Sequence, residues 1–92
     1  FGAAAKGNTF LNYCGIGRDF IDFVADDTPY KQGMFLPGSR LSICPREKLM
    51  EEKPDIVLIL PWNWADEIAR QISFVKEYGG ELVTLIPELK KY

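Results

Sequence analysis

The feature that most constrains the fold of this chain is a nearly continuous apolar run at residues 55–60, followed directly by a helical pattern. The run Asp55-Ile56-Val57-Leu58-Ile59-Leu60 lacks the alternation of a half-exposed strand and is typical of a central strand buried on both faces. An apolar stripe at helical spacing then extends from Trp64 to Val75, with Asn63 as the expected N-terminal cap and Gly79-Gly80 as the expected end. Apolar runs that alternate with helical patterns predict βαβ construction and a parallel sheet, hence an α/β fold.

The remaining segments continue this alternation. We expect a short helix through residues 10–13 that ends at Gly15, followed by a strand at 20–25. A long irregular loop at 26–39, with a turn at Pro37-Gly38, leads to a short edge strand at 41–43. A helix at 45–52 precedes the apolar run, and a last strand at 82–86 ends at Pro87. A loop as long as 26–39 in so small a domain is usually functional.

The expected first strand is missing. A glycine turn that opens a helix normally follows a strand, and here the turn begins within two residues of Phe1. In a doubly wound sheet that strand is central, so its loss would leave a groove between its neighbours. We therefore expect the chain to be marginally stable or to fill the groove by self-association.

Composition limits the class of protein. The 92 residues allow a single domain, residues 1–92, and the 47% apolar content is ordinary for a globular chain. The net charge is −2 and the lysines and arginines are scattered, which argues against a nucleic-acid partner. No apolar run approaches the roughly 20 residues needed to span a bilayer, so no membrane partner is expected and a cytoplasmic location is predicted.

The chain has no histidine, which excludes a Ser-His-Asp triad, a Cys-His dyad and any histidine-ligated metal site. Its two cysteines, Cys14 and Cys44, form no C-x-x-C pair, and we expect both to be buried thiols rather than metal ligands. No catalytic residue and no metal ligand is therefore predicted, and a binding role is favoured over a catalytic one.

The glycine turn at residues 2–9, Gly2-Ala3-Ala4-Ala5-Lys6-Gly7-Asn8-Thr9, is the first candidate binding site. Small residues allow close approach to the backbone, and the N-terminus of the following helix favours an anion such as phosphate. The spacing resembles a Walker A motif, but Asn8 occupies the position of the phosphate-binding lysine, while Lys6 lies within the turn. A merely tight strand-to-helix turn with a solvated lysine is the alternative.

Two further candidates follow expected strands. Asp26 comes after the second strand, where dinucleotide-binding folds place an acid that holds a ribose hydroxyl, although with Asp27 it could also be a solvated turn. Trp62 and Asn63 follow the central strand, at the edge where open α/β sheets bind ligands. Trp64 is assigned to the core. Tyr30 and Lys31 in the long loop add polar groups. Either these groups reach a diphosphate, or they simply lie on the surface.

Several blocks, taken together and in order, resemble a known family over all 92 residues: Gly2-Ala3-Ala4-Ala5-Lys6-Gly7-Asn8-Thr9, Leu11-Asn12-Tyr13-Cys14, Pro29-Tyr30-Lys31-Gln32-Gly33, Pro37-Gly38, Lys53-Pro54-Asp55, Leu60-Pro61-Trp62-Asn63, Ala65-Asp66-Glu67-Ile68, Gly79-Gly80 and Ile86-Pro87-Glu88. They are similar to the C-terminal domain of SAM-dependent sugar C-methyltransferases.

The resemblance implies a three-part enzyme with an N-terminal zinc domain, a middle SAM-binding domain that carries the catalytic base, and this Rossmann-like, three-layer C-terminal domain with a mostly parallel sheet. A nucleotide-linked deoxysugar lies between the last two domains in that family. SAM and zinc are thus expected in other domains of the intact protein, and no cofactor in this one.

The resemblance also implies which residues bind the nucleotide sugar: Gly2, Ala3, Ala4, Lys6, Gly7, Asn8, Asp26, Tyr30, Lys31, Trp62 and Asn63. This sequence departs from the family at Asp27-Thr28, where relatives more often have a basic residue and an asparagine. The predicted function is to hold a nucleotide sugar for methylation by the preceding domain. The alternatives are a structural domain that only contacts the catalytic half, and an NAD(P)-binding domain, which the absence of G-x-G-x-x-G disfavours.

Overall fold

The computed structural model describes residues 1–3, 5–85 and 88–92, with Ala5 and Lys6 described through their backbone alone. The elements follow one another as α1 (Ala5–Cys14), β1 (Val24–Ala25), the 3₁₀ turn η1 (Pro29–Lys31), β2 (Ile43–Cys44), α2 (Glu47–Glu52), β3 (Ile56–Leu58), the 3₁₀ turn η2 (Trp62–Trp64), α3 (Ala65–Gln71), α4 (Phe74–Glu77), β4 (Glu81–Thr84) and β5 (Lys90–Lys91). The alternation of strands and helices confirms the predicted α/β class.

The strands of the described residues form two small sheets. β1 pairs with β2 in parallel, with Val24 opposite Ile43. β3 pairs in parallel with β4, and β4 pairs with β5 in the antiparallel direction. Parallel pairing is thus confirmed for both crossovers, but the strands are divided between two sheets instead of lying in one.

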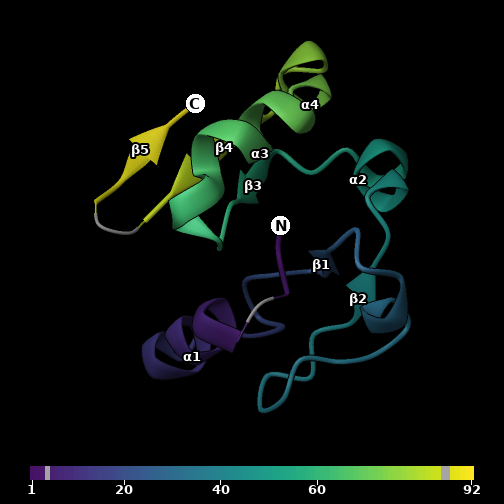
Figure 1. The fold of residues 1–92 in the computed structure, drawn as a ribbon, viewed down its shortest axis with the longest axis vertical. Helices are drawn as coiled ribbons and strands as arrows, with labels where there is room; N and C mark the ends of the chain where they lie inside the picture. The colour runs from purple at the N-terminus through teal and green to yellow at the C-terminus, as the bar shows by residue number, and fades with distance from the viewer. Residues whose placement is uncertain (4, 86–87) are drawn as a thin grey trace.

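The apolar core consists of two clusters, each centred on one of the sheets. β3 and β4 pack against α3 and α4 through residues such as Val57, Ile72 and Leu82. β1, β2 and α1 share a second cluster that includes Leu11 and Ile43. The two halves appear as the upper and lower parts of the molecule, and the N-terminus lies between them (Figure 1).

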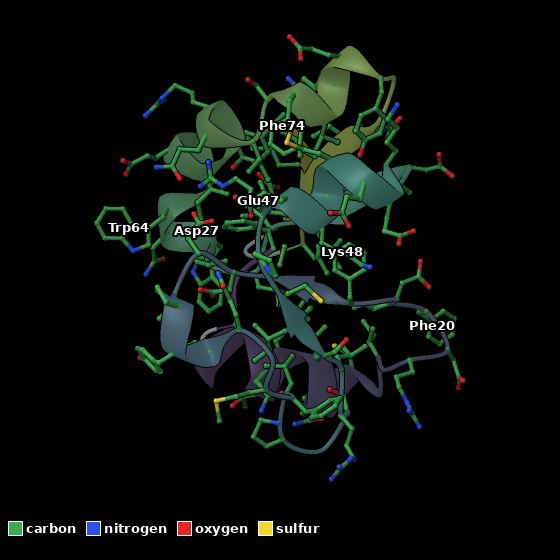
Figure 2. All side chains as sticks on the ribbon, turned by 90° about the vertical axis from the view of Figure 1, so that its right-hand side faces the viewer. Phe20, Asp27, Glu47, Lys48, Trp64 and Phe74 are labelled. Atoms are coloured by element: carbon green, nitrogen blue, oxygen red, sulfur yellow. The ribbon has the colours of Figure 1, made fainter. Side chains whose placement is uncertain are left out.

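The predicted strands at 20–25 and 55–60 are shorter than expected. Only Val24 and Ala25 form β1, while Phe20 is 79% exposed and extends away from the body of the molecule (Figure 2). β3 is not buried on both faces, because Ile56 is 61% exposed whereas Val57 is buried. The cause is a missing neighbour: among the residues that the structure describes, the backbone of β3 pairs with β4 on one side and, on the other, bonds only to Phe1 at its carboxyl end.

The helix predicted from Asn63 onward is interrupted. Its first turn is η2, and α3 and α4 are separated at Ile72 and Ser73. The capping prediction for Asn63 is wrong, since Trp64 occupies the cap position of α3 and no side chain caps it. The core assignment of Trp64 is also wrong: its side chain is 65% exposed and points outward (Figure 2).

The positions of glycine predicted helix ends and a turn correctly. α1 ends before Gly15, which has a φ of +69°, and α4 is followed by Gly79 with a φ of +93°. The predicted turn at Pro37-Gly38 is also present, with Gly38 at a φ of +85°. Such values favour glycine because a Cβ atom makes the left-handed region costly.

The edge strand predicted at 41–43 is displaced to Ile43–Cys44, and the helix predicted at 45–52 forms as α2. The expectation of buried thiols is wrong for Cys14, which is exposed at the end of α1, and Cys44 is only half-buried. The end of the last predicted strand, residues 86–87, lies outside the described residues, and β4 spans Glu81–Thr84.

Candidate functional site

The glycine turn passes between the two halves of the molecule and is closed by Pro61. Gly2 has a φ of +100°, and a Cβ atom there would lie 2.4 Å from Pro61 Cδ. A side chain is therefore excluded on both conformational and steric grounds. The turn leads directly into α1, so that the backbone of residues 2 and 3 lies beside the carboxyl end of β3.

Asp26 closes the turn from the other side. Its Oδ2 accepts a hydrogen bond from the Ala3 N–H at 2.7 Å, and its Oδ1 accepts one from the Thr28 N–H at 2.7 Å. Partial burial alone would raise the pKa of Asp26. The hydrogen bonds from the Thr28 hydroxyl and the Ala3 and Thr28 backbone, together with the charge of Lys31, outweigh it and lower the pKa below its ordinary value.

Lys31 approaches the same turn from η1. Its Nζ donates to the Ala3 carbonyl at 3.2 Å, and the neighbouring Gln32 Nε2 donates to the backbone carbonyl of Asp26 at 3.0 Å. An ammonium group with three donors, one of which is used at Ala3, can still bind an anionic oxygen. Tyr30, the residue before it, is 77% exposed.

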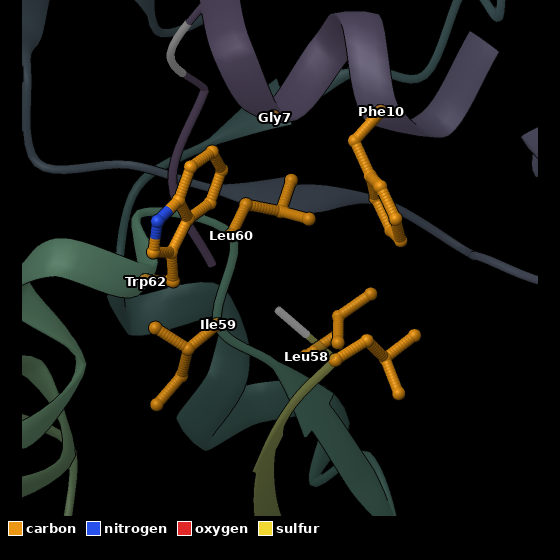
Figure 3. A pocket seen from close by; sticks show the side chains of 7 residues that line it. Gly7, Phe10, Leu58, Ile59, Leu60 and Trp62 are labelled. Atoms are coloured by element: carbon orange, nitrogen blue, oxygen red, sulfur yellow. The ribbon is translucent and has the colours of Figure 1, made fainter. Parts of the chain in front are cut away.

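Trp62 and Gly7 lie on the opposite side of the turn. Together with Phe10 and Leu60 they line a small apolar hollow of about 10 Å³, which has room for roughly one water molecule (Figure 3). α1 closely approaches the segment that follows β3, because a Cβ atom on Gly7 would lie 2.8 Å from Leu60 Cβ. Asn63 is exposed on η2.

The first turn of α1 contains one unsatisfied acceptor. Among the described residues, no group donates to Oδ1 of Asn8, although that atom is buried. Buried acceptors are normally paired, so a donor such as a hydroxyl is expected to face it. The predictions for Ala4 and for the side chain of Lys6 lie outside the described residues.

The structure thus brings Gly2, Ala3, Asp26 and Lys31 into direct contact, although they come from segments up to 28 residues apart. Gly7, Asn8 and Trp62 lie next to this cluster along α1 and η2. Tyr30 and Asn63 are exposed on the surface, and neither forms a hydrogen bond with this cluster among the described residues. The arrangement offers backbone groups, a carboxylate and an ammonium around a glycine turn, which suits polar, anionic ligands.

Sequence reasoning missed Arg46. Its guanidinium forms a bidentate ion pair with Asp27, donates to the Oε1 of Gln71 at 3.1 Å and lies 5.8 Å from the centroid of the Phe1 ring. Arg46 therefore connects the end of β1 with α3. The ion pair with Arg46 gives the Asp27 carboxylate a structural partner.

Two classes of site have no support in the described part of the chain. No group of three or more histidine, cysteine, aspartate or glutamate side chains is arranged to hold a metal ion among the residues described. No helix within residues 1–3, 5–85 and 88–92 is long and apolar enough to cross a membrane.

Comparison with known proteins identifies the family of the chain. Residues 1–87 match the model of the C-methyltransferase C-terminal domain. The chain belongs to this family. It is also 42% identical over 88 residues to the C-methyltransferase NovU of Streptomyces niveus.

The match covers 96% of this chain and 21% of that relative, so this C-methyltransferase C-terminal domain spans about a fifth of the relative's length. The resemblance expected from the sequence blocks is confirmed. The glycine turn, Asp26 and Lys31 are accordingly parts of the C-terminal domain of a C-methyltransferase.

Proposed function

We propose that this domain binds a nucleotide-linked deoxysugar and positions it for methylation by a preceding SAM-binding domain. The observation that carries the proposal is the cluster of Ala3, Asp26 and Lys31, joined by hydrogen bonds of 2.7 and 3.2 Å around a turn that only glycine can form. The domain would have no activity of its own. Its contribution to the reaction would be to hold the acidic carbon of the sugar near the methyl donor.

Each group has a chemical task in this proposal. The Lys31 ammonium and the backbone N–H groups at the start of α1 attract the diphosphate. The Asp26 carboxylate accepts hydrogen bonds from hydroxyl groups, as does Oδ1 of Asn8, to which no group of the described residues donates. Trp62 beside the turn offers an apolar ring face to a base or sugar. Lys6, Tyr30 and Asn63 would complete the site when the ligand is bound.

The proposal includes a finer fold assignment and further components of the intact protein. The domain would be Rossmann-like, with helices on both sides of one mostly parallel sheet. SAM and zinc would bind in preceding domains of the same polypeptide, and this domain would bind neither. No nucleic acid or membrane enters the proposal.

The test measures the affinity for dTDP, a nucleoside diphosphate without the sugar, by calorimetry. Replacing Lys31 with alanine should weaken binding by about 1 to 3 kcal/mol, the value of a charge-assisted hydrogen bond. Lys76→Ala is the matched control, since Lys76 is an exposed lysine on α4. Equal affinities for the Lys31 and Lys76 variants would remove Lys31 from the site.

The structural alternative, in which the domain only contacts the catalytic half, has one observation in its favour. Trp64 is 65% exposed on η2, and a large exposed aromatic ring is typical of an interface. If the intact protein binds dTDP without contribution from Lys31 or Asp26, while Trp64→Ala weakens the contact between domains, the structural function replaces the binding function.

A further inference from the structure

A groove separates the two sheets. It has a volume of about 280 Å³ and lies between the backbones of β1 and β3. Its walls are largely apolar and come from both halves of the molecule: Leu11, Phe20, Phe23, Leu49, Ile56 and Leu58. The exposed side chains of Phe20 and Ile56, which contradicted the sequence prediction, are therefore walls of this groove.

Phe1 and Gly2 already bond as the last residues of a strand lying in the groove. The Phe1 nitrogen donates to the Leu58 carbonyl at 2.5 Å, and the Phe1 carbonyl accepts from the Leu60 N–H at 2.9 Å. Phe1 thus bonds through its nitrogen and its carbonyl to the residues just before and just after Ile59. This pattern is typical of two parallel strands. Gly2 then donates in the opposite direction, to the Ala25 carbonyl at 2.8 Å.

Two further backbone N–H groups, one on each side, face the groove. Val24 and Asp26 donate to Ser42 and Cys44 of the β2 side, so the intervening Ala25 N–H points into the groove. On β3, Ile59 donates to Val83 of β4, so the N–H of Leu58 likewise faces the groove. These two donors mark where the next hydrogen bonds of a parallel strand would form.

We propose that the groove binds a parallel β-strand formed by the segment that directly precedes Phe1 in a longer polypeptide. The carbonyl of the residue immediately before Phe1 would accept from Ala25, and that of the second residue before it would accept from Leu58. The strand would pair with β1 on one side and β3 on the other and join the two sheets into one.

Chain continuity favours this occupant over a second copy. The Phe1 nitrogen lies at the end of the groove, so a segment that precedes Phe1 enters the groove without a connecting loop. A strand from another molecule would instead end against the amino group of Phe1. Burial lowers the pKa of this amino group to about 5, and a peptide N–H at the same place would carry no charge to bury. The relative NovU is also about five times longer, since the match covers 21% of it.

The resulting strand order supports the inference. A strand inserted between β1 and β3 would give the order β2, β1, inserted strand, β3, β4, β5 across one sheet. Numbered along the chain this is 3-2-1-4-5-6, the order of the dinucleotide-binding α/β sheet. The inserted strand would end at the glycine turn, where that fold binds phosphate. The inference concerns the sheet alone and does not require that a sugar binds.

The experiment compares residues 1–92 with a longer form of the protein that includes about ten residues before Phe1, the upper length of an ordinary strand. Amide hydrogen exchange of Ala25 and Leu58 should slow by about 100-fold or more in the longer form. The exchange of the Val24 amide, which already bonds to the Ser42 carbonyl, should slow by a smaller factor. Nuclear Overhauser effects should connect the added residues with Phe23 and Ala25 on one side and with Ile56 and Leu58 on the other.

A matched pair of variants in the longer form gives a second readout. Ile56→Glu, on the groove, should lower Tm by about 5 °C or more, whereas Leu89→Glu should change it by less than about 2 °C. Both side chains are similarly exposed in the present chain, at 61% and 65%. Failure of residues 1–92 to fold while the longer form folds with these contacts also supports the proposal.

Equal and rapid exchange of the Ala25 and Leu58 amides in both forms would overturn the proposal. Protection that rises with concentration and remains dimer-dependent in the longer form would also overturn it, because the occupant would then be a second copy. Neither result would alter the calorimetric comparison of the Lys31 and Lys76 variants, so the two proposals fail separately.

Discussion

At the scale of single residues, the free amino group that Phe1 carries in a polypeptide of residues 1–92 gives the stability of that polypeptide a definite pH dependence. Burial lowers its pKa from 8.0 to about 5, and the negative charge of Asp26 offsets only part of this effect. Between pH 5 and 8 the unfolded chain therefore holds a proton that the folded chain has released. The free energy of unfolding should increase with pH across this window.

Acetylation of Phe1 tests this prediction. The acetylated nitrogen keeps an N–H for the Leu58 carbonyl but has no charge to lose, so the increase in stability from pH 5 to pH 8 should largely disappear. Urea unfolding of the free and acetylated chains at both pH values measures the difference. The same pH slope in both chains would contradict the burial of the amino group.

Arg46 leads to a second prediction at this scale. Its bidentate pairing with Asp27 and its bond to Gln71 hold the end of β1 against α3. The pair is partly exposed, so its coupling should be modest, about 0.5 to 1 kcal/mol, at the upper end of surface pairs. A double-mutant cycle with Arg46→Ala and Asp27→Ala measures it, and strictly additive losses would show that the ion pair contributes nothing.

At the scale of elements, the contact between α1 and Leu60, just after β3, depends on the small size of Gly7. A methyl group there would lie 2.8 Å from Leu60 Cβ, which cannot move without its backbone. The overpacking cost of about 1 to 3 kcal/mol should exceed the roughly 1 kcal/mol that alanine gains in a helix. Gly7→Ala should therefore destabilise the domain by about 1 kcal/mol.

Gly17→Ala is the control for this prediction. Among the described residues, its added methyl group would meet only Ser39 Cβ, at an ordinary 3.9 Å, and its φ is not positive. The free energy of unfolding should then change by less than about 0.5 kcal/mol. If Gly7→Ala is as stable as Gly17→Ala, α1 does not pack against Leu60 as closely as described.

Helix ends were predictable at this scale, and helix continuity was not. Gly15 and Gly79 mark helix ends through their own backbone conformation, a local property that sequence displays. The break at Ile72 and Ser73 has no such signal, because the apolar stripe continues through Ile72 and Val75, which are both fully buried. Periodicity records which side chains face the core and is insensitive to a short interruption of the backbone.

At the scale of the whole molecule, the candidate site was predictable where a topological rule applied. Asp26 was a candidate because it follows β1, and the carboxyl ends of parallel strands are where α/β sheets place polar groups. Its carboxylate does bond to the glycine turn, at the Ala3 N–H. Arg46 was unpredictable, since its bonds to Asp27 and Gln71 span 19 and 25 residues and depend on how the two halves pack. The exposure of Ile56 was missed because burial of β3 needs a neighbour on each side.

The measurement that tests the central claim most directly is an NMR titration of the protein with dTDP, with SAM and NAD titrated separately. The account predicts that dTDP alone shifts the amide resonances of Ala3, Asp26 and Lys31, the residues joined around the glycine turn. Resonances of α4, at Lys76 for example, should not move. Shifts of the turn with NAD or SAM instead, or no shift there with dTDP, would contradict the proposal that this domain holds the nucleotide sugar.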